Sequence, residues 1–430
     1  MKVKVIGAGL AGAEAAYYLA RRGVKVALYD IKPNSFTPAH NSENFAELVC
    51  SNSLKSSDVY GNAAGLLKEE MRLLGSVTME AAEYAKVPAG GALAVNRDEF
   101  SVFITDRLKN HPNIEFISEE ITEIPTDGFT VIATGPLTTE RLSAALKKVA
   151  GALSFYDASA PIIAADSIDT EYAFKGDRYN RGDGDHINCP MNKDEYDAFY
   201  EALILAERAK LHEFEKSEIF EGCMPVEVMA ARGKDTLRFG PLKPVGLDDP
   251  KTGRWAYATL QLRKENKAGT MYNMVGFQTN LKFGEQKRVF SMIPALKSAE
   301  FLRYGVMHRN TFINSSTALN PDYSFKEYPN VFVAGQLSGV EGYVESAGSG
   351  LLAAIYLERK LKGEREILIS ENTVLGALSR YVATPNKDFE PMNANFGILP
   401  PLTVRDKKER KRLMAERSLA AVKEFLSEIN

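Results

Sequence analysis

The N-terminal segment carries the feature that most constrains the fold. An apolar stretch leads directly into three glycines, Gly7, Gly9 and Gly12, which are followed by an alanine-rich stretch of helical character. A second apolar stretch, 24–29, ends in Asp30. In this order, the first glycine permits a tight turn, the second lets a diphosphate approach the backbone, and the third lets the helix pack closely on the strand. The sequence therefore predicts a dinucleotide-binding βαβ unit, with phosphates at the helix N-terminus and a ribose on Asp30.

A secretory signal is the competing interpretation, because Lys2 and Lys4 precede an apolar stretch with small residues. The glycines and Glu14 interrupt that stretch, whereas the core of a signal peptide is continuously apolar. No other run approaches the roughly 18 apolar residues that a membrane span requires. We therefore expect a soluble, cytoplasmic protein without a membrane association.

Composition limits the function classes. The chain has 430 residues, 45% of them hydrophobic and 25% charged, which is typical of a globular enzyme with two or three domains. The formal net charge of −3 argues against an overall basic surface, so any RNA contact needs a local patch. The three cysteines, Cys50, Cys189 and Cys223, show no CxxC spacing, and the five histidines do not cluster with them. We expect neither a disulfide framework nor a metal site.

Two later segments resemble the first in their chemistry. Residues 129–135 form an apolar strand that ends in Gly135, and residues 330–339 form another, followed by a glycine-rich loop at 340–350 and an apolar helix at 351–361. The alternative for the segment from 330 to 361 is an ordinary structural strand-to-helix turn. Together, the three segments predict an α/β fold with one discontinuous, Rossmann-like FAD-binding domain of the two-dinucleotide-binding type. We assign it to residues 1–186 and 318–430.

Residues 187–317 predict an inserted α+β domain. Asn192–Glu195 is typical of a helix start, and apolar and aromatic residues follow at helical spacing. Turn residues then separate segments with strand character. The expected strands are 237–239, 255–262 and 271–281, in an antiparallel sheet whose Met, Tyr and Phe side chains form core rather than a base-stacking surface.

The C-terminal segment 405–417 contains seven basic and three acidic residues. This excess of positive charge can bind phosphate, or it can belong to a solvated helix end. In the second case, Leu413, Leu419, Val422 and Leu426 pack inward.

Two cysteines lie in contexts that favour reactivity. Cys50 and Cys223 are each flanked by small or turn-forming residues, where backbone N–H groups can stabilise a thiolate. The alternative is that both are small buried hydrophobic residues. Cys189 precedes Pro190 and has no such context, so it receives no role.

Several longer segments resemble the folate- and FAD-dependent tRNA (uracil-5-)-methyltransferase family along essentially the whole chain. They are GAGLAGAEAAYYLA, ELVCSNSLKS, PAGGALAVNRDEF, VIATGPLT, EGCMPVEVMAARG, LRFGPLKPVGL, YNMVGFQTNLKFGEQKRVF, FINSS and GQLSGVEGYVESAGSGLLAA. One departure is Asp30, where the family is expected to have glutamate. Either carboxylate can bind ribose hydroxyls.

The resemblance implies methylation of C5 of a T-loop uridine in tRNA. It implies 5,10-methylenetetrahydrofolate as carbon donor, reduced FAD as reductant, and NADH or NADPH as the nicotinamide substrate. Cys223 corresponds to the nucleophile that adds to uracil C6, and Cys50 to the base that removes the C5 proton. No obligate protein partner is inferred.

The expected cofactor-binding residues are Gly7, Ala8, Gly9, Leu10, Ala11, Gly12, Asp30, Gly135, Gly335, Gly342, Tyr343 and Glu345. Five cations are candidates for holding diphosphate, folate glutamate or tRNA phosphate: Arg97, Arg232, Lys243, Lys282 and Arg288.

Three other functions remain open at this point. One is a related flavin-dependent enzyme that modifies the wobble uridine of tRNA, although that family is expected to have a helical C-terminal extension. Another is an FAD oxidoreductase of a small molecule, with the insertion as a substrate cap. The third is a noncatalytic flavin-binding RNA chaperone.

Overall fold

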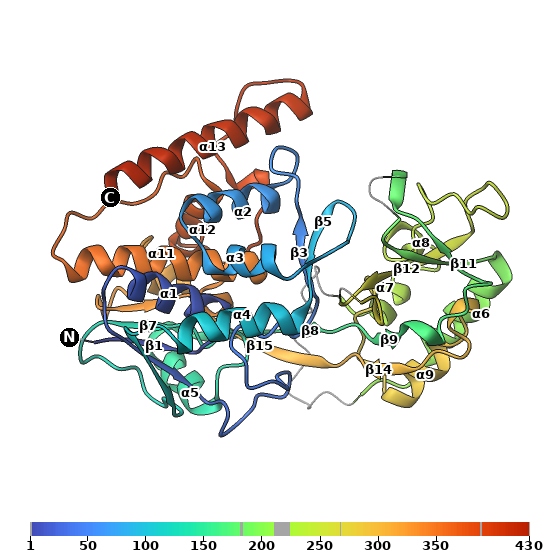
Figure 1. Ribbon diagram of the computed structural model, residues 1–430, viewed down its shortest axis with the longest axis horizontal. Coiled ribbons are helices and arrows are strands. Elements are labelled where there is room, and N and C mark those ends of the chain that lie inside the picture. Colours follow the sequence, from blue (N-terminus) through green and yellow to red (C-terminus); the bar gives the residue numbers. More distant parts are fainter. Residues whose placement is uncertain (1, 181–183, 210–223, 267, 388, 430) are drawn as a thin grey trace.

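The computed structural model describes residues 2–180, 184–209, 224–266, 268–387 and 389–429 (Figure 1). A five-stranded sheet combines segments from both ends of the chain. Its order is β16-β7-β1-β2-β6, and every neighbouring pair is parallel. The strands are β1 (Val3–Ile6), β2 (Val26–Asp30), β6 (Ile114–Ser118), β7 (Thr130–Ile132) and β16 (Val331–Val333). Strands β1, β7 and β16, which come from the three separate glycine-containing segments, are neighbours, so the Rossmann-like α/β expectation is confirmed.

Helices from both parts of the chain surround this sheet. They are α1 (Leu10–Arg21), α2 (Ala63–Leu73), α3 (Val77–Tyr84), α4 (Arg97–Lys109), α5 (Glu140–Ala150), α10 (Ser315–Ala318), α11 (Tyr343–Leu361), α12 (Val374–Ala383) and α13 (Lys407–Ile429). The last helix, α13, lies along α2 at the top of Figure 1. A small sheet with the order β3-β5-β4 lies beside them, formed by β3 (Ser53–Ser56), β4 (Lys86–Val87) and β5 (Ala92–Val95).

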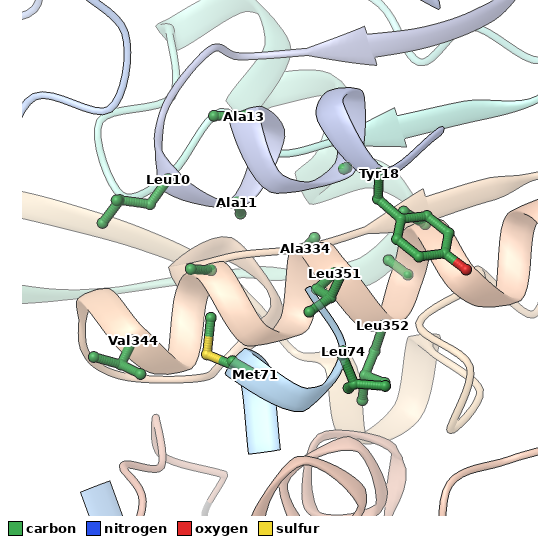
Figure 2. Close-up of a cluster of buried hydrophobic side chains, with 14 of the residues drawn as sticks. Leu10, Ala11, Ala13, Tyr18, Met71, Leu74, Ala334, Val344, Leu351 and Leu352 are labelled. Atoms are coloured by element: carbon green, nitrogen blue, oxygen red, sulfur yellow. The ribbon is translucent and has the colours of Figure 1, made fainter. Parts of the chain in front are cut away.

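Helices α1 and α11 pack directly against each other (Figure 2). A Cβ atom added to Gly350 would lie 2.1 Å from the carbonyl oxygen of Ala11, so this approach requires glycine. Around the contact, the side chains of Tyr18, Leu351 and Leu352 are buried. Their burial removes apolar surface from water and fixes the two helices relative to each other.

This packing corrects the prediction of a glycine-rich loop at 340–350. Helix α11 begins at Tyr343, so most of that segment is helical. The small residues allow close helix packing rather than providing loop flexibility, since a Cβ on Gly348 would also lie 2.7 Å from the Leu375 side chain.

The insertion contains a six-stranded antiparallel sheet, on the right of Figure 1, with the order β10-β11-β12-β13-β9-β14. The strands are β9 (Ile162–Ala164), β10 (Phe174–Lys175), β11 (Ile187–Met191), β12 (Ala258–Lys264), β13 (Met271–Met274) and β14 (Phe301–Arg303). Its helices are α6 (Lys193–Leu205), α7 (Val226–Ala231), α8 (Thr236–Phe239) and α9 (Phe283–Phe290).

Strands β8 (Ala152–Ala158) and β15 (Met307–Ile313) form an antiparallel pair. In the sequence, β8 directly precedes the strands of the insertion sheet and β15 directly follows them. Short 3-10 helices occupy Ala165–Ser167, Arg178–Asn180, Pro294–Leu296, Gln336–Ser338 and Phe396–Ile398.

The expected boundary of the insertion at residue 187 falls inside this antiparallel sheet, between the paired strands β10 and β11. Strands β9 and β10 precede that boundary and are only three and two residues long, too short to give a periodic sequence signal. We therefore propose an insertion that spans approximately 159–306, between the two strands of the β8–β15 pair.

The start of α6 follows the expectation. Asn192 and Glu195 form a capping box, in which the Asn192 side chain accepts the N–H of Glu195 and the Glu195 carboxylate accepts the N–H of Asn192. Tyr196, Phe199 and Leu203 are fully buried, as core packing predicts.

Two of the expected strands of the insertion are wrong in type or length. Residues 237–239 lie in α8, where local bonds such as Arg238 N–H to the Asp235 carbonyl replace strand pairing. The strand expected at 271–281 ends at Met274. Gly276 follows with φ +77°, and a Cβ there would lie 2.7 Å from Pro241.

Glu70 of α2 connects three helices at a buried contact. Its carboxylate accepts hydrogen bonds from the N–H groups of Val374 (2.7 Å) and Leu375 (2.9 Å) at the start of α12. The Ser418 hydroxyl of α13 donates a third bond of 2.5 Å. Complete burial nevertheless raises the pKa of Glu70 to about 7, because ionisation in the core is costly.

This raised pKa predicts a pH-dependent stability. Protonation of Glu70 stabilises the folded state fully below about pH 4.5, the pKa of an ordinary glutamate, and this stabilisation is lost as the pH rises through about 7. Between these values, the free energy of unfolding should fall by up to about 3 kcal/mol because of this group. Urea unfolding at pH 5 and pH 8 measures the difference, and Glu70→Gln should reduce it. Glu69→Gln, which changes the half-buried neighbour paired with Arg72, is the control. An unreduced pH dependence in Glu70→Gln would contradict the assignment.

Candidate functional site

A cavity of about 400 Å³ opens at the carboxyl edge of the parallel sheet. It lies where β1 and β2 end and where α1 and α11 begin, the usual place for a ligand in an open α/β sheet. Its wall includes Gly7, Gly9, Leu10, Ala11, Asp30, Cys50, Gly135, Gly335, Gly342 and Tyr343. The structure therefore brings these sequence-predicted residues together.

The glycine turn after β1 has a separate physical reason at each glycine. Gly7 has φ +97°, and a Cβ there would lie 2.5 Å from the Ala133 carbonyl oxygen. A Cβ on Gly12 would lie 1.8 Å from the carbonyl oxygen of Gly7, so the helix packs directly on the turn. By contrast, a Cβ on Gly9 meets no protein atom within 4 Å, and its φ of −72° is open to any residue. The packing of the protein itself therefore does not require glycine at position 9. Gly9 belongs to the cavity wall, and the open space next to it is part of the cavity.

Two helix N-termini face this cavity. Gly9 caps α1 and Gly342 caps α11, and neither residue provides a side-chain cap. The first N–H groups of both helices therefore remain available for an anionic ligand. Ala8 and Gly12 belong to the turn but not to the cavity wall.

Asp30 lies at the end of β2, with both carboxylate oxygens held by the backbone. Oδ2 accepts the N–H of Ala8 (2.7 Å), and Oδ1 accepts the N–H of Lys32 (2.9 Å). Each carboxylate oxygen can accept more than one hydrogen bond, so the group can also bind ribose hydroxyls. These bonds link β2 to the glycine turn and fix the carboxylate in the cavity wall.

Glu345, in the first turn of α11, is fully buried and connects the helix to Lys55 and Ala394. Its Oε1 accepts from Lys55 Nζ (2.7 Å) and from the N–H of Ala394 (2.9 Å), whereas its buried Oε2 has no hydrogen-bond partner. Lys68 lies nearby, donates to the carbonyls of Leu54 and Ala64, and has its pKa lowered to about 8 by burial. Lys55 lines the cavity and was not predicted from the sequence.

The loop that carries Cys50 is fixed by residues from distant parts of the chain. Tyr343 Oη accepts the N–H groups of Cys50 (2.7 Å) and Ser51 (3.2 Å). Arg97 donates to the carbonyls of Leu48 (2.9 Å) and Cys50 (3.4 Å), and it forms a bidentate ion pair with Glu265.

A second arginine, Arg263 of β12, donates to the side chains of Asn52 (3.0 Å) and Ser51 (2.8 Å). Cys50 itself is half-buried, and its thiol donates to the Ala158 carbonyl over 3.6 Å. The loop is therefore held rigidly between the insertion, α4 and α11, with its cysteine at the cavity.

The other cysteines differ in setting. Cys189 is fully buried in β11, and burial raises the pKa of its thiol, which is consistent with a core residue. Cys223, the expected nucleophile, lies outside the described residues.

The five predicted cations do not form one group. Arg97 is half-buried and forms an ion pair with the buried Glu265. Lys282 and Arg288 are exposed and pair with Glu207 and Glu285, and neither lines the cavity. Arg232 is exposed and Lys243 is half-buried, also away from the cavity wall.

The basic C-terminal segment belongs mostly to α13, and several of its cations are already engaged. Lys411 donates to the Gly61 carbonyl (2.9 Å), Arg417 to the Pro400 carbonyl (2.6 Å), and Arg412 pairs with Glu409 and Glu416. Of the residues expected to pack inward, Val422 is fully buried. These contacts favour the solvated-helix interpretation over a phosphate-binding patch.

Within the described ranges, no group of three or more His, Cys, Asp or Glu residues could hold a metal ion. Among the same residues, every helix is too short or too polar to cross a membrane.

Comparison with known proteins agrees with this geometry. The family model described as glucose inhibited division protein A matches residues 2–365. A methylenetetrahydrofolate–tRNA-(uracil-5-)-methyltransferase TrmFO from Acetivibrio thermocellus is 56% identical over 430 residues, covering 99% of this chain and 98% of the relative. The chain belongs to the TrmFO family. The TrmFO protein from Bacillus mycoides is 56% identical, over 99% of this chain and 99% of the relative. The TrmFO protein from Lactobacillus delbrueckii is 55% identical, over 99% of this chain and 98% of the relative.

Two solved structures resemble this chain in fold. GidA from Aquifex aeolicus aligns with a TM-score of 0.73 and 16% identity in one crystal form, over 100% of this chain and 73% of the GidA chain. In a second crystal form the TM-score is 0.70 at 17% identity, over 99% and 78% of the two chains. At this identity the similarity concerns the fold alone.

Proposed function

We propose that this chain transfers a one-carbon unit from 5,10-methylenetetrahydrofolate to C5 of a T-loop uridine in tRNA, with reduced FAD as the reductant. The observation that carries the proposal is the 56% identity, over nearly the full length of both chains, to relatives named for this activity. Those names specify the folate donor, tRNA and uracil C5. The T-loop position, NADH or NADPH as electron source, and a cytoplasmic location are further parts of the proposal.

The cavity has the features that FAD binding requires. The open space at Gly9 and the uncapped N-terminus of α1 suit a diphosphate, with Gly7, Ala8, Leu10, Ala11 and Gly12 forming the turn around it. Asp30 would bind the ribose hydroxyls. Around the remaining part of the cofactor we place Gly135, Gly335, Gly342, Tyr343 and Glu345. The unpartnered Oε2 of Glu345 is consistent with a polar ligand group near the start of α11.

The reaction must add one carbon and two electrons to uracil. The methylene group of the folate is one hydride short of a methyl group, and bound FAD, after reduction by NADH or NADPH, would supply that hydride. Uracil loses its C5 proton in exchange, and the products are 5-methyluridine, tetrahydrofolate and oxidised nicotinamide. The chain must therefore activate uracil, remove a proton and exclude water.

In this proposal, Cys223 is the nucleophile and Cys50 is the base. Uracil C5 becomes nucleophilic when the Cys223 thiolate adds to C6 and forms an enolate. After the carbon transfer, Cys50 removes the C5 proton, and elimination of Cys223 restores the double bond. The position of Cys50 supports its role, because its rigid loop holds the thiol at the cavity beside Tyr343. The target uridine must leave its stack in the T-loop to reach this position.

Replacement of Gly9 tests the cofactor part of the proposal. Gly9→Val should leave the protein folded, because no protein atom lies within 4 Å of the new Cβ, but its side chain should exclude the diphosphate. The purified variant should have lost most of its visible flavin absorbance. Gly284→Val, at an equally open glycine in α9, is the control and should remain yellow. Normal flavin occupancy in Gly9→Val would contradict the assignment.

The roles of the cysteines are separated by trapping with tRNA that contains 5-fluorouridine, in which C5 cannot lose a proton. Cys223→Ala should form no covalent protein–tRNA adduct, because addition to C6 is lost. Cys50→Ala should still form the adduct with fluorinated tRNA and should also accumulate one with ordinary tRNA, because proton removal stalls. Denaturing electrophoresis measures both.

The third cysteine provides the matched control. Cys189→Ala changes a core residue of β11 and should trap fluorinated tRNA as the unmodified protein does. An adduct in Cys223→Ala together with its absence in Cys50→Ala would reverse the two roles.

A further inference from the structure

Arg303 is a half-buried cation beside the Cys50 loop. It is the last residue of β14, one of the two edge strands of the insertion sheet. Three residues later, the N–H of Val306 donates over 3.0 Å to Oγ of Ser159, a residue of the cavity wall. Ser159 follows Ala158, whose carbonyl accepts the Cys50 thiol. Arg303 therefore lies where the insertion meets the reactive loop.

The electrostatic neighbours of Arg303 all belong to this site. It interacts with Arg97, Tyr343, Glu47 and Cys50. The pKa of His40 is lowered mainly by burial, with smaller contributions from the charges of Lys32 and Arg303. Except for Arg97, these neighbours line the cavity. Burial and the charge of Arg97 lower the pKa of Arg303, but a guanidinium remains charged at neutral pH.

Arg303 differs from the two other arginines near Cys50 because it has no partner of its own. Arg97 is neutralised by Glu265, and Arg263 donates to Ser51 and Asn52. Its backbone pairs with Ile162 of β9, but within the described part of the chain the Arg303 guanidinium forms neither a hydrogen bond nor an ion pair.

The nearby carboxylate of Glu47 is engaged elsewhere, since it accepts the N–H groups of Asn41 (3.0 Å) and Ser42 (3.2 Å). A half-buried charge without a partner is costly, so this arrangement favours an anion from outside the chain. A guanidinium binds phosphate or carboxylate through paired hydrogen bonds.

We propose that Arg303 binds the phosphate on the 5′ side of the target uridine while the base lies beside Cys50. This inference rests on the proposed function, in which Cys50 acts at uracil C5. In an anti nucleotide, the C5–C6 edge of the base faces its own 5′-phosphate, so a cation near Cys50 is close to that phosphate. The glutamate carboxylates of the folate lie beyond its p-aminobenzoyl group, far from the reacting carbon, and fit this position less well.

The test combines a protein variant with a neutralised phosphate. Binding is measured with two T-arm stem–loop RNAs, one natural and one with an uncharged methylphosphonate on the 5′ side of the target uridine. For the unmodified protein, the methylphosphonate should weaken binding about tenfold, and Arg303→Gln should weaken binding of the natural RNA by a similar factor. The two changes together should cost no more than either alone, because they remove the same contact. Arg303→Lys, which keeps the charge but loses the paired donors, should be intermediate.

Lys287→Gln is the matched control, because it removes an exposed positive charge from the same part of the chain, in α9. It should keep the full sensitivity to the methylphosphonate. Flavin absorbance and thermal unfolding report whether each variant keeps its fold. Independent, multiplying losses for Arg303→Gln and the methylphosphonate would overturn the proposal, and so would unchanged RNA binding in that variant.

Two further measurements separate the possible failures. Weaker binding of methylenetetrahydrofolate to Arg303→Gln, with RNA binding unchanged, would assign the residue to the folate carboxylate and overturn the phosphate proposal. Transfer of labelled carbon to the natural RNA by the unmodified protein tests the proposed function itself. If that transfer occurs but the losses multiply, only the role of Arg303 is wrong; if no transfer occurs, both proposals fail.

Discussion

The close contact between α1 and α11 is the constraint on which the site depends. Gly350 lies against the Ala11 backbone, and a Cβ on Gly335 would lie 3.1 Å from the Ala11 side chain. Because both helices begin at the carboxyl edge of the same parallel sheet, this contact brings two uncapped N-termini to one cavity. Their N–H groups provide partial positive charge where an anionic dinucleotide would bind. The packing of the core and the chemistry of the site therefore have one structural cause.

The position of Cys50 depends on the association of the insertion with the parallel-sheet unit. Tyr343 holds its loop from α11, Arg97 from α4 and Arg263 from β12 of the insertion. Arg97 and Glu265 also join the two units through an ion pair, and loss of Arg97 would leave the buried charge of Glu265 unpaired. A reactive thiol must be held to within about 0.5 Å of its productive position, so it benefits from this support by several elements.

Local patterns made part of this structure predictable. The glycine turn at Gly7 and the capping box at Asn192 depend on neighbouring residues, and the structure has both. The start of α11 was misplaced because small residues have the same signature in a loop and in a close helix contact. The contacts of Tyr343 with Cys50 and the unpaired state of Arg303 depend on residues far apart in the sequence, which no local pattern encodes. The resemblance to a family supplied the roles of Cys50 and Cys223, and these roles remain proposals.

The most direct test follows the carbon atom. The protein is incubated with tRNA, NADH or NADPH, and methylenetetrahydrofolate labelled in its methylene group, and the nucleosides of the T-loop and anticodon fragments are analysed by mass spectrometry. We expect the label in 5-methyluridine of the T-loop, and only when the folate, the nicotinamide and the flavin-loaded protein are all present. Label at the wobble uridine, or nicotinamide oxidation without any labelled nucleoside, would contradict the assigned function.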